Sequence, residues 1–261
     1  MLCVSAIDYD IFLEEDCAIN TKKKSEFKDG LLEHLVILNQ IISRRYGQPD
    51  KIFRCIGNLC YEHNTSYSVK APPIELYEEK REFFVRALAG RKNLLEVGFN
   101  AGHSALLAMT SHPNLKYTGI DICGAKYTMQ CANYLTEAFK DRFSFIKGDS
   151  REILPLLATH HPRKKFDVFH IDGDHNEGPV RADIGNILRI AQTGSIVILD
   201  DINFPGVAKA YDEFVKLGRL RPAQIRGFKN VGRKSVIAIP LPDSAVSIAE
   251  RISKKNPRSE G

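Results

Sequence analysis

The chain has 261 residues, of which 43% are hydrophobic and 26% are charged, with a formal net charge of +5. This composition is close to the globular average and excludes a disordered chain, a collagen-like repeat and a disulfide-stapled miniprotein. The positive charge is mild, and much of it lies in Lys22, Lys23, Lys24 and the C-terminal tail. It indicates a solvated surface rather than a nucleic-acid partner, which requires one clustered basic face.

The sequence carries no signal for export or for a membrane. No run of 18 apolar residues occurs, so we expect no membrane span. Residues 1–17 contain five acids and no basic region, which is unlike a signal peptide. The six cysteines include no C-x-x-C pair and are interpreted as reduced thiols. Together these features predict a cytoplasmic protein.

Three regions are predicted along the chain: an N-terminal extension (1–73), a catalytic domain (74–242) and a C-terminal tail (243–261). Within the extension, apolar residues at 31, 32, 35, 38, 41 and 42 predict one amphipathic helix that ends before Gly47 and Pro49. The extension is a candidate lid, with Tyr61 to Tyr67 over the site, or a candidate element of a homodimer.

The catalytic region alternates short apolar runs with helical stretches of roughly 10–15 residues, which is typical of βαβ units and a parallel sheet. Near-continuous apolar strands indicate a sheet covered on both faces. A helix is expected at 207–216 and a closing pair of β segments at 224–228 and 235–240. The expected parallel strands are 92–98, 116–121, 143–147, 166–172 and 195–200.

Acidic residues follow several of these strands. Strand one runs into Glu96 and a glycine loop, strand two ends at Asp121, and strand three is followed by Asp149 and Ser150. Strand four ends at Asp172 and strand five at Asp200 and Asp201. Because ligands bind beyond the carboxyl ends of the strands in open α/β sheets, these residues predict a polar site along one sheet edge.

The loop between Gly98 and Gly102 lets backbone approach a ligand without a Cβ in the way. It is neither G-x-G-x-x-G nor a P-loop with its lysine, which disfavours dinucleotides and triphosphates. Asp121 follows Gly98 by 23 residues, where a carboxylate can accept hydrogen bonds from two ribose hydroxyls. The alternative is a tight turn with a surface acid.

With LLEVGFNAGHS (94–104) and Asp121, residues 74–240 resemble the class I S-adenosylmethionine-dependent methyltransferases. The resemblance implies a doubly wound, Rossmann-like α/β sheet of seven strands in the order 3-2-1-4-5-7-6, with strand seven antiparallel. It implies that the glycine loop faces the methionine part of the cofactor, Asp121 the ribose and Asp149 the adenine. The candidate cofactor-binding residues are Glu96, Gly98, Asn100, Gly102, Ser104, Asp121, Asp149, Ser150 and Asp172.

FHIDGDH (169–175) and ILDDINFPG (198–206) resemble the metal-dependent O-methyltransferases of the catechol and caffeoyl-coenzyme A type. The resemblance implies Mg²⁺ ligands at Asp172, Asp200 and Asp201. Those relatives have Asn at the third position, so Asp201 adds a negative charge. Either this extra charge changes which metal is preferred, or Asp201 is not itself a metal ligand. Three carboxylates with water suit a hard octahedral cation.

His175 follows Asp172 by three residues, where the catechol type carries a lysine that acts as general base. Methyltransferases that act on sugar hydroxyls have Asp-x-x-His at this point and resemble the chain more closely. An imidazole can accept a proton near neutral pH, so His175 is the candidate base. The alternative is a loop histidine that caps a helix beginning near Glu177. His170 is interpreted as a satisfied strand histidine.

The sequence thus predicts a methyltransferase that uses S-adenosylmethionine and Mg²⁺ to methylate a hydroxyl of a sugar or glycosylated metabolite. The acceptor is then a small molecule or a glycan. Two alternatives remain open at this stage. One is methylation of a catechol-like phenol, whose adjacent hydroxyls would chelate the metal. The other is a non-catalytic protein that binds S-adenosylmethionine, although such a protein has no use for a metal triad with a base.

Overall fold

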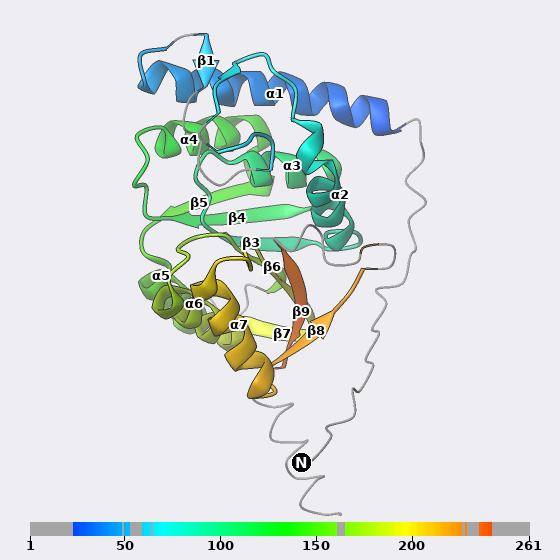
Figure 1. The fold of residues 1–261 in the computed structure, drawn as a ribbon, viewed down its shortest axis with the longest axis vertical. Helices are drawn as coiled ribbons and strands as arrows, with labels where there is room; N and C mark the ends of the chain where they lie inside the picture. Colours follow the sequence, from blue (N-terminus) through cyan, green and yellow to red (C-terminus); the bar gives the residue numbers. More distant parts are fainter. Residues whose placement is uncertain are drawn as a thin grey trace, which may run out of the picture.

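The computed structural model describes residues 23–48, 50–52, 59–63, 65–160, 165–225, 228 and 235–241. The predicted tail (243–261) and residues 1–22 lie outside this range. A seven-stranded sheet forms the centre of the molecule, with helices on both faces (Figure 1). None of the described helices combines the length and apolar character needed to cross a membrane.

The strand order is β5-β4-β3-β6-β7-β9-β8, which is the predicted order 3-2-1-4-5-7-6. Neighbouring strands from β5 to β7 pair in parallel, and β9 pairs antiparallel with both β7 and β8. The fold prediction is therefore confirmed. The strands are β3 (Asn93–Val97), β4 (Lys116–Asp121), β5 (Phe143–Lys147), β6 (Phe166–Ile171), β7 (Ala191–Leu199), β8 (Leu220–Ala223) and β9 (Val236–Pro240).

Two strand predictions need correction. The first segment of the closing pair was expected at 224–228, but β8 occupies Leu220–Ala223. Pro222 argues against a strand because it has no N–H to donate, yet β8 is the edge strand, where that absence is tolerated. In addition, β7 begins at Ala191, ahead of the expected start at 195.

Alternate residues of each central strand enter opposite cores. Leu94 packs into the core shared with α1 to α4, whereas Leu95 packs into the core shared with α5 to α7. Both leucines are almost fully buried, as expected for parallel strands covered on both sides. The helices are α1 (Lys23–Arg45), α2 (Glu78–Ala87), α3 (His103–Ser111), α4 (Thr128–Phe139), α5 (Ser150–His160), α6 (Glu177–Ile190) and α7 (Pro205–Lys216), with short 3₁₀ turns at Glu75–Tyr77 and Lys140–Arg142.

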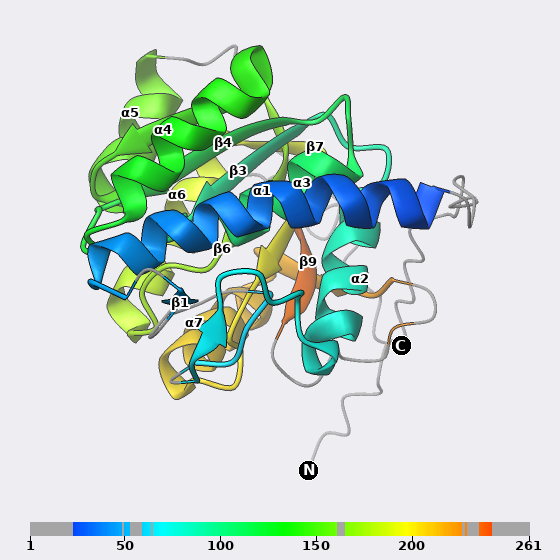
Figure 2. The same ribbon diagram turned by 90° about the horizontal axis from the view of Figure 1, so that it is seen from above.

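The N-terminal extension belongs to the same core. The predicted helix is present as α1, which packs along α3 and α4 (Figure 2). Its buried residues Leu31, Leu35, Leu38 and Ile42 recur at helical spacing. A small hairpin of β1 (Lys51–Ile52) and β2 (Tyr67–Ser68), which the sequence did not predict, follows it.

Buried Asn39 of α1 joins the helix to the segment after it. Its side-chain nitrogen donates to the hydroxyl of Tyr61 at 2.8 Å and to the carbonyl of Val69 at 3.1 Å. The Tyr61 ring meets that of His103 edge-on, at the start of α3. The extension is therefore packed against the helix that follows the glycine loop, and its expected roles as lid or dimer element stay predictions.

Candidate active site

The glycine loop is fitted tightly against the end of β6. Gly98 has φ +95°, and a Cβ there would lie 2.0 Å from the carbonyl oxygen of Asp172. Gly102 has φ +78°, and its Cβ would lie 2.5 Å from the ring of Phe99. Both positions therefore require glycine. At Gly98 the nearest atoms are those of Asp172, so the missing Cβ lets the glycine loop lie directly beside the end of β6 and its acidic residue.

Asp121 is held at the end of β4 by backbone amides. Asn100 N donates to its Oδ2 at 2.7 Å and Cys123 N to its Oδ1 at 2.6 Å. Each carboxylate oxygen keeps a further lone pair, so the side chain can still accept from ribose hydroxyls. The Asn100 side chain accepts a hydrogen bond from the hydroxyl of Tyr127 at 2.6 Å, which fixes the loop.

Ile122 is a residue that sequence reasoning missed. It directly follows Asp121, and 67% of its surface is exposed. An exposed apolar side chain beside a candidate ribose carboxylate is free to pack against an apolar part of a ligand. A hydrophobic residue immediately after the acid of strand two could have signalled it.

Asp149 and Ser150 both form hydrogen bonds with other side chains of the protein. Both oxygens of Asp149 accept from the Arg151 guanidinium, which with the Arg151 amide lowers the pKa of Asp149. The Ser150 hydroxyl donates to Asp183 of α6 at 2.6 Å. Their assignment to the cofactor stays a prediction, and Ser150 would have to share its hydroxyl with Asp183.

Glu96 lies fully buried beneath the loop. One oxygen accepts a very short hydrogen bond from the Tyr117 hydroxyl, and the other lies 2.6 Å from Nδ1 of His170. The interpretation of His170 as a satisfied strand histidine is confirmed. Both Glu96 oxygens thus have partners inside the protein, and a contact of Glu96 or of nearly buried Ser104 with the cofactor stays a prediction.

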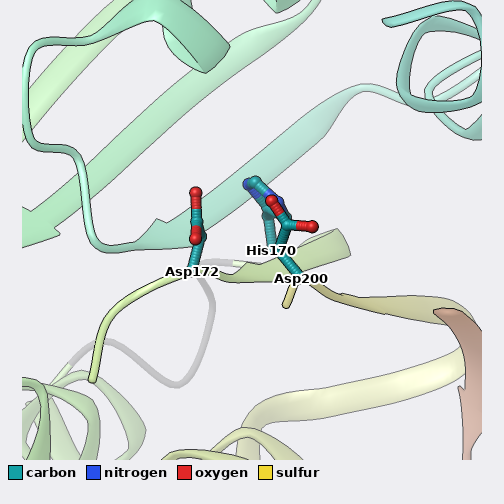
Figure 3. A group of neighbouring side chains, drawn as sticks. All are labelled: His170, Asp172 and Asp200. Atoms are coloured by element: carbon teal, nitrogen blue, oxygen red, sulfur yellow. The ribbon is translucent and has the colours of Figure 1, made fainter. Parts of the chain in front are cut away.

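The three predicted metal-binding carboxylates divide between two overlapping groups of side chains. In each group, the potential ligand atoms lie within 4.8 Å of one another. One group is His170, Asp172 and Asp200, at the ends of β6 and β7 (Figure 3). The other is Asp172, His175 and Asp201. Asp172 belongs to both, so the structure brings the predicted residues together around it.

The Asp200 carboxylate is already paired with a cation of the protein, Lys80. The ammonium of this α2 residue lies 2.5 Å from Oδ2 of Asp200, and the side chains are only 13% and 3% exposed. Burial alone would lower the pKa of Lys80, but Asp200 and Asp172 raise it above its ordinary value. Sequence reasoning missed Lys80. It lies within the charged run Glu78–Glu82, and such a run is typical of a solvated helix face.

The other oxygen of Asp200 accepts from the Ser235 hydroxyl at 2.6 Å and from the Asp201 amide at 2.9 Å. Although burial opposes it, Lys80 holds the pKa of Asp200 below its usual range. For Asp172, burial and then the charge of Asp200 raise the pKa well above the ordinary value. The inner carboxylates are therefore unequal, because their surroundings shift the pKa of Asp200 down and the pKa of Asp172 up.

His175 lies at the outer side of the cluster. Its Nε2 is 3.1 Å from Oδ2 of Asp201, and its ring stacks on Phe204 at a centroid distance of 4.4 Å. The hydrogen bond that His175 donates to the Asp201 carboxylate raises the pKa of His175, although burial opposes the shift. Asp201 has φ +54°, a strained conformation that Asp tolerates better than most residues and that is common at functional sites.

The residues present fit the two expected ligands. For S-adenosylmethionine they supply a carboxylate at Asp121 with exposed Ile122 beside it, leading through the glycine loop to Asp172. For a divalent cation they supply carboxylate oxygens from Asp172, Asp200 and Asp201, the donors that hard cations prefer. Lys80 already occupies one side of that oxygen set.

Residues 95–202, which contain the glycine loop and the carboxyl ends of β3 to β7, match the family model of a methyltransferase domain. This match shows that the chain contains a methyltransferase domain and is therefore an enzyme, and its strand order is the one that the resemblance to the class I S-adenosylmethionine-dependent methyltransferases implies. No curated protein matches the chain in sequence.

Solved structures share the fold at low sequence identity. The O-methyltransferase TomG from Streptomyces achromogenes, involved in tomaymycin synthesis and solved with S-adenosylmethionine, is 17% identical with a TM-score of 0.54. That match covers 80% of this chain and 89% of TomG. The methyltransferase PaMTH1 from Podospora anserina, bound to S-adenosylhomocysteine, is 13% identical with a TM-score of 0.52, covering 87% and 99% of the two chains. An O-methyltransferase from Bacillus cereus, also with S-adenosylhomocysteine, is 14% identical with a TM-score of 0.50, covering 62% and 81%.

Proposed function

We propose that the chain is a divalent-cation-dependent O-methyltransferase that methylates a hydroxyl of a sugar or a glycosylated metabolite. The observation that carries this proposal is the outer group of Asp172, His175 and Asp201 directly beside the cofactor loop. An oxygen acceptor needs a base and a neighbouring positive charge, and this group supplies the base and the carboxylates that hold a cation. TomG and the Bacillus cereus enzyme are O-methyltransferases with the same fold, which supports oxygen as the acceptor atom.

His175 is the residue proposed to take the acceptor proton. Asp201 engages Nε2, which fixes the tautomer with the proton on that nitrogen. In the described part of the chain no hydrogen bond engages Nδ1, so Nδ1 can accept the proton of a hydroxyl group. S-adenosylmethionine, when bound, supplies an electrophilic methyl group on a positively charged sulfur.

The proposed cation ligands are Asp172, Asp200 and Asp201, with Mg²⁺ the cation that suits an all-carboxylate set. When bound, such a cation supplies a positive charge that lowers the pKa of a hydroxyl, as metals do for bound water. A sugar hydroxyl needs this help because its pKa lies far above that of an imidazole.

A catechol-like phenol is the second candidate acceptor. The exposed ring of Phe204, stacked on His175, presents an aromatic surface at the edge of the site. Aromatic rings favour offset stacking on such a surface. The Asp-x-x-His pattern supports a sugar hydroxyl as the acceptor, whereas the aromatic surface of Phe204 supports a phenol.

The test is a methyl-transfer assay on protein freed of metal with EDTA, with glycosides and catechols as acceptors and with Mg²⁺ added back. We expect turnover only with Mg²⁺ and with glycosides preferred. Asp172→Ala should abolish turnover, whereas Asp174→Ala should not, because exposed Asp174 only caps the local turn at Asn176. Full activity in EDTA would remove the cation from the proposal, and a preference for catechols would favour the second acceptor.

A further inference from the structure

We propose that Lys80 is a resident cation that competes with the divalent cation for Asp200 and so sets how tightly that cation binds. This inference rests on the cation site of the proposed function. It assigns a role in the site to Lys80, which lies on α2 and belongs neither to the glycine loop nor to the strand ends.

The position of Lys80 is built rather than incidental. Lys80 lies in the first turn of α2, directly after the 3₁₀ turn at Glu75–Tyr77, and its side chain is largely buried. A buried ammonium is stable only when it is paired, and its pair is Asp200 Oδ2 at 2.5 Å. The short distance to a carboxylate oxygen favours the charged ammonium, because opposite charges in a buried pair stabilise each other.

A divalent cation and Lys80 would require the same oxygen. Oδ1 of Asp200 already accepts from Ser235 and from the Asp201 amide, which leaves Oδ2 as the oxygen open to a ligand. Lys80 holds Oδ2. A cation bound to Oδ2 of Asp200 would lie next to the Lys80 ammonium. Two positive charges that share one oxygen ligand repel each other strongly in a buried site. The ammonium must therefore move away, or the cation must rely on Asp172 and Asp201.

The lysine side chain allows such an exchange. Its flexible four-carbon stem carries a point charge that can swing without any movement of the backbone. Removal of the charge leaves Asp200 buried without its main partner, which makes the cluster a stronger site for a cation. The protein thus exchanges its own cation for an external one, at a cost in affinity that Lys80 determines.

The experiment measures Mn²⁺ affinity by the loss of the free-ion electron paramagnetic resonance signal, on metal-free protein without acceptor. Lys80→Met, which keeps the length of the side chain but not the charge, should bind Mn²⁺ at least about tenfold more tightly than the wild type. Lys116→Met is the matched control. It makes the same change in net charge at an exposed residue that begins β4, at the end of the strand away from the site, and it should bind Mn²⁺ as the wild type does. In the double variant Lys80→Met with Asp200→Asn, the gain should disappear.

The possible results distinguish the inference about Lys80 from the proposed function. Equal or weaker binding by Lys80→Met overturns the inference, while a rate that requires Mg²⁺ would leave the proposed function standing. Binding by Lys80→Met but not by the wild type supports the inference and contradicts the cation of the proposed function. Binding by neither overturns both. Thermal unfolding checks that the variants are folded, and Lys80→Gln, which can still donate to Asp200, replaces Lys80→Met if that variant does not fold.

Discussion

His175 and Asp201 form a pair across two loops, with Nε2 of the imidazole 3.1 Å from Oδ2 of the carboxylate. The pair is held in place by packing behind it. A Cβ at Gly206, in the first turn of α7, would lie 2.4 Å from the His175 carbonyl oxygen, so the two loops are in direct contact. The imidazole is therefore oriented by Asp201 on one side and by Phe204 on its face.

The first prediction concerns this base. His175→Ala should lower kcat by about 10²–10⁴-fold, the usual contribution of a positioned base. Affinity for S-adenosylhomocysteine, measured by calorimetry, should change little because His175 does not belong to the glycine loop. A variant with nearly the wild-type kcat would show that His175 is only a loop residue, the alternative that its sequence position left open.

The second prediction concerns the pKa of His175, measured by NMR from the ring protons. In cation-free protein the Asp201 hydrogen bond raises this pKa above 6.5, so the imidazole loses its proton at a higher pH than a free histidine. Asp201→Asn should bring the pKa down, because the amide carries no charge. Mg²⁺ should also bring it down, because a nearby cation disfavours the imidazolium. A pKa that does not respond to either change would separate His175 from the acidic cluster.

The third prediction concerns the ribose carboxylate. Asp121→Ala should weaken S-adenosylhomocysteine binding by about 100-fold or more, since each hydrogen bond to a charged group contributes about 1.5–3 kcal/mol. Asp167→Ala is the matched control, because Asp167 also accepts two backbone amides, from Lys92 and Asn93, but at the opposite end of the sheet. Calorimetry that shows equal losses in both variants would assign the effect to stability rather than to ribose.

Sequence reasoning could predict what depends on local pattern. The parallel core and the acids after each strand follow from short apolar runs that end in polar residues, whereas the strand order was implied by the resemblance to the class I methyltransferases. The convergence of Asp172, Asp200 and Asp201 follows from parallel strands ending at one edge. Lys80 could not be predicted in this way, because its place in the site depends on its ion pair with Asp200, a contact between residues over a hundred positions apart in the sequence. The edge strand was misplaced because Pro222 is acceptable only in a position that the sheet topology defines.

The fourth prediction tests how tightly the glycine loop fits the end of β6. Gly98→Ala would place a methyl group 2.0 Å from the Asp172 carbonyl, where neither backbone can yield. Gly90→Ala is the control, because Gly90 also has a positive φ (+70°) but nothing lies within 4 Å of its Cβ. Gly90→Ala should cost about 1–2 kcal/mol of unfolding free energy in urea, the cost of a left-handed residue. Gly98→Ala should cost clearly more, and equal costs would contradict the close contact.

The last prediction concerns Asp183, a buried carboxylate of α6. Burial raises its pKa to about 6, although the Ser150 hydroxyl that donates to it opposes the shift. The folded state therefore binds this proton more tightly than the unfolded state, so the unfolding free energy falls as the pH rises from the unfolded pKa to about 6. Above that pH the ionised carboxylate stays buried at a cost.

Asp183→Asn removes this cost while its amide oxygen still accepts from Ser150. At pH 8 it should stabilise the fold by about 1–3 kcal/mol, from about 1.4 kcal/mol for each pKa unit. The gain should shrink toward zero near pH 4, where Asp183 is protonated in the folded wild type. Urea unfolding at both pH values measures it. Asp212→Asn, the same change at an exposed position on α7, should stay within about 0.5 kcal/mol at both pH values. Destabilisation by Asp183→Asn at pH 8 would mean that the Asp183 carboxylate is a net stabilising partner of Ser150, contrary to the cost inferred from its burial.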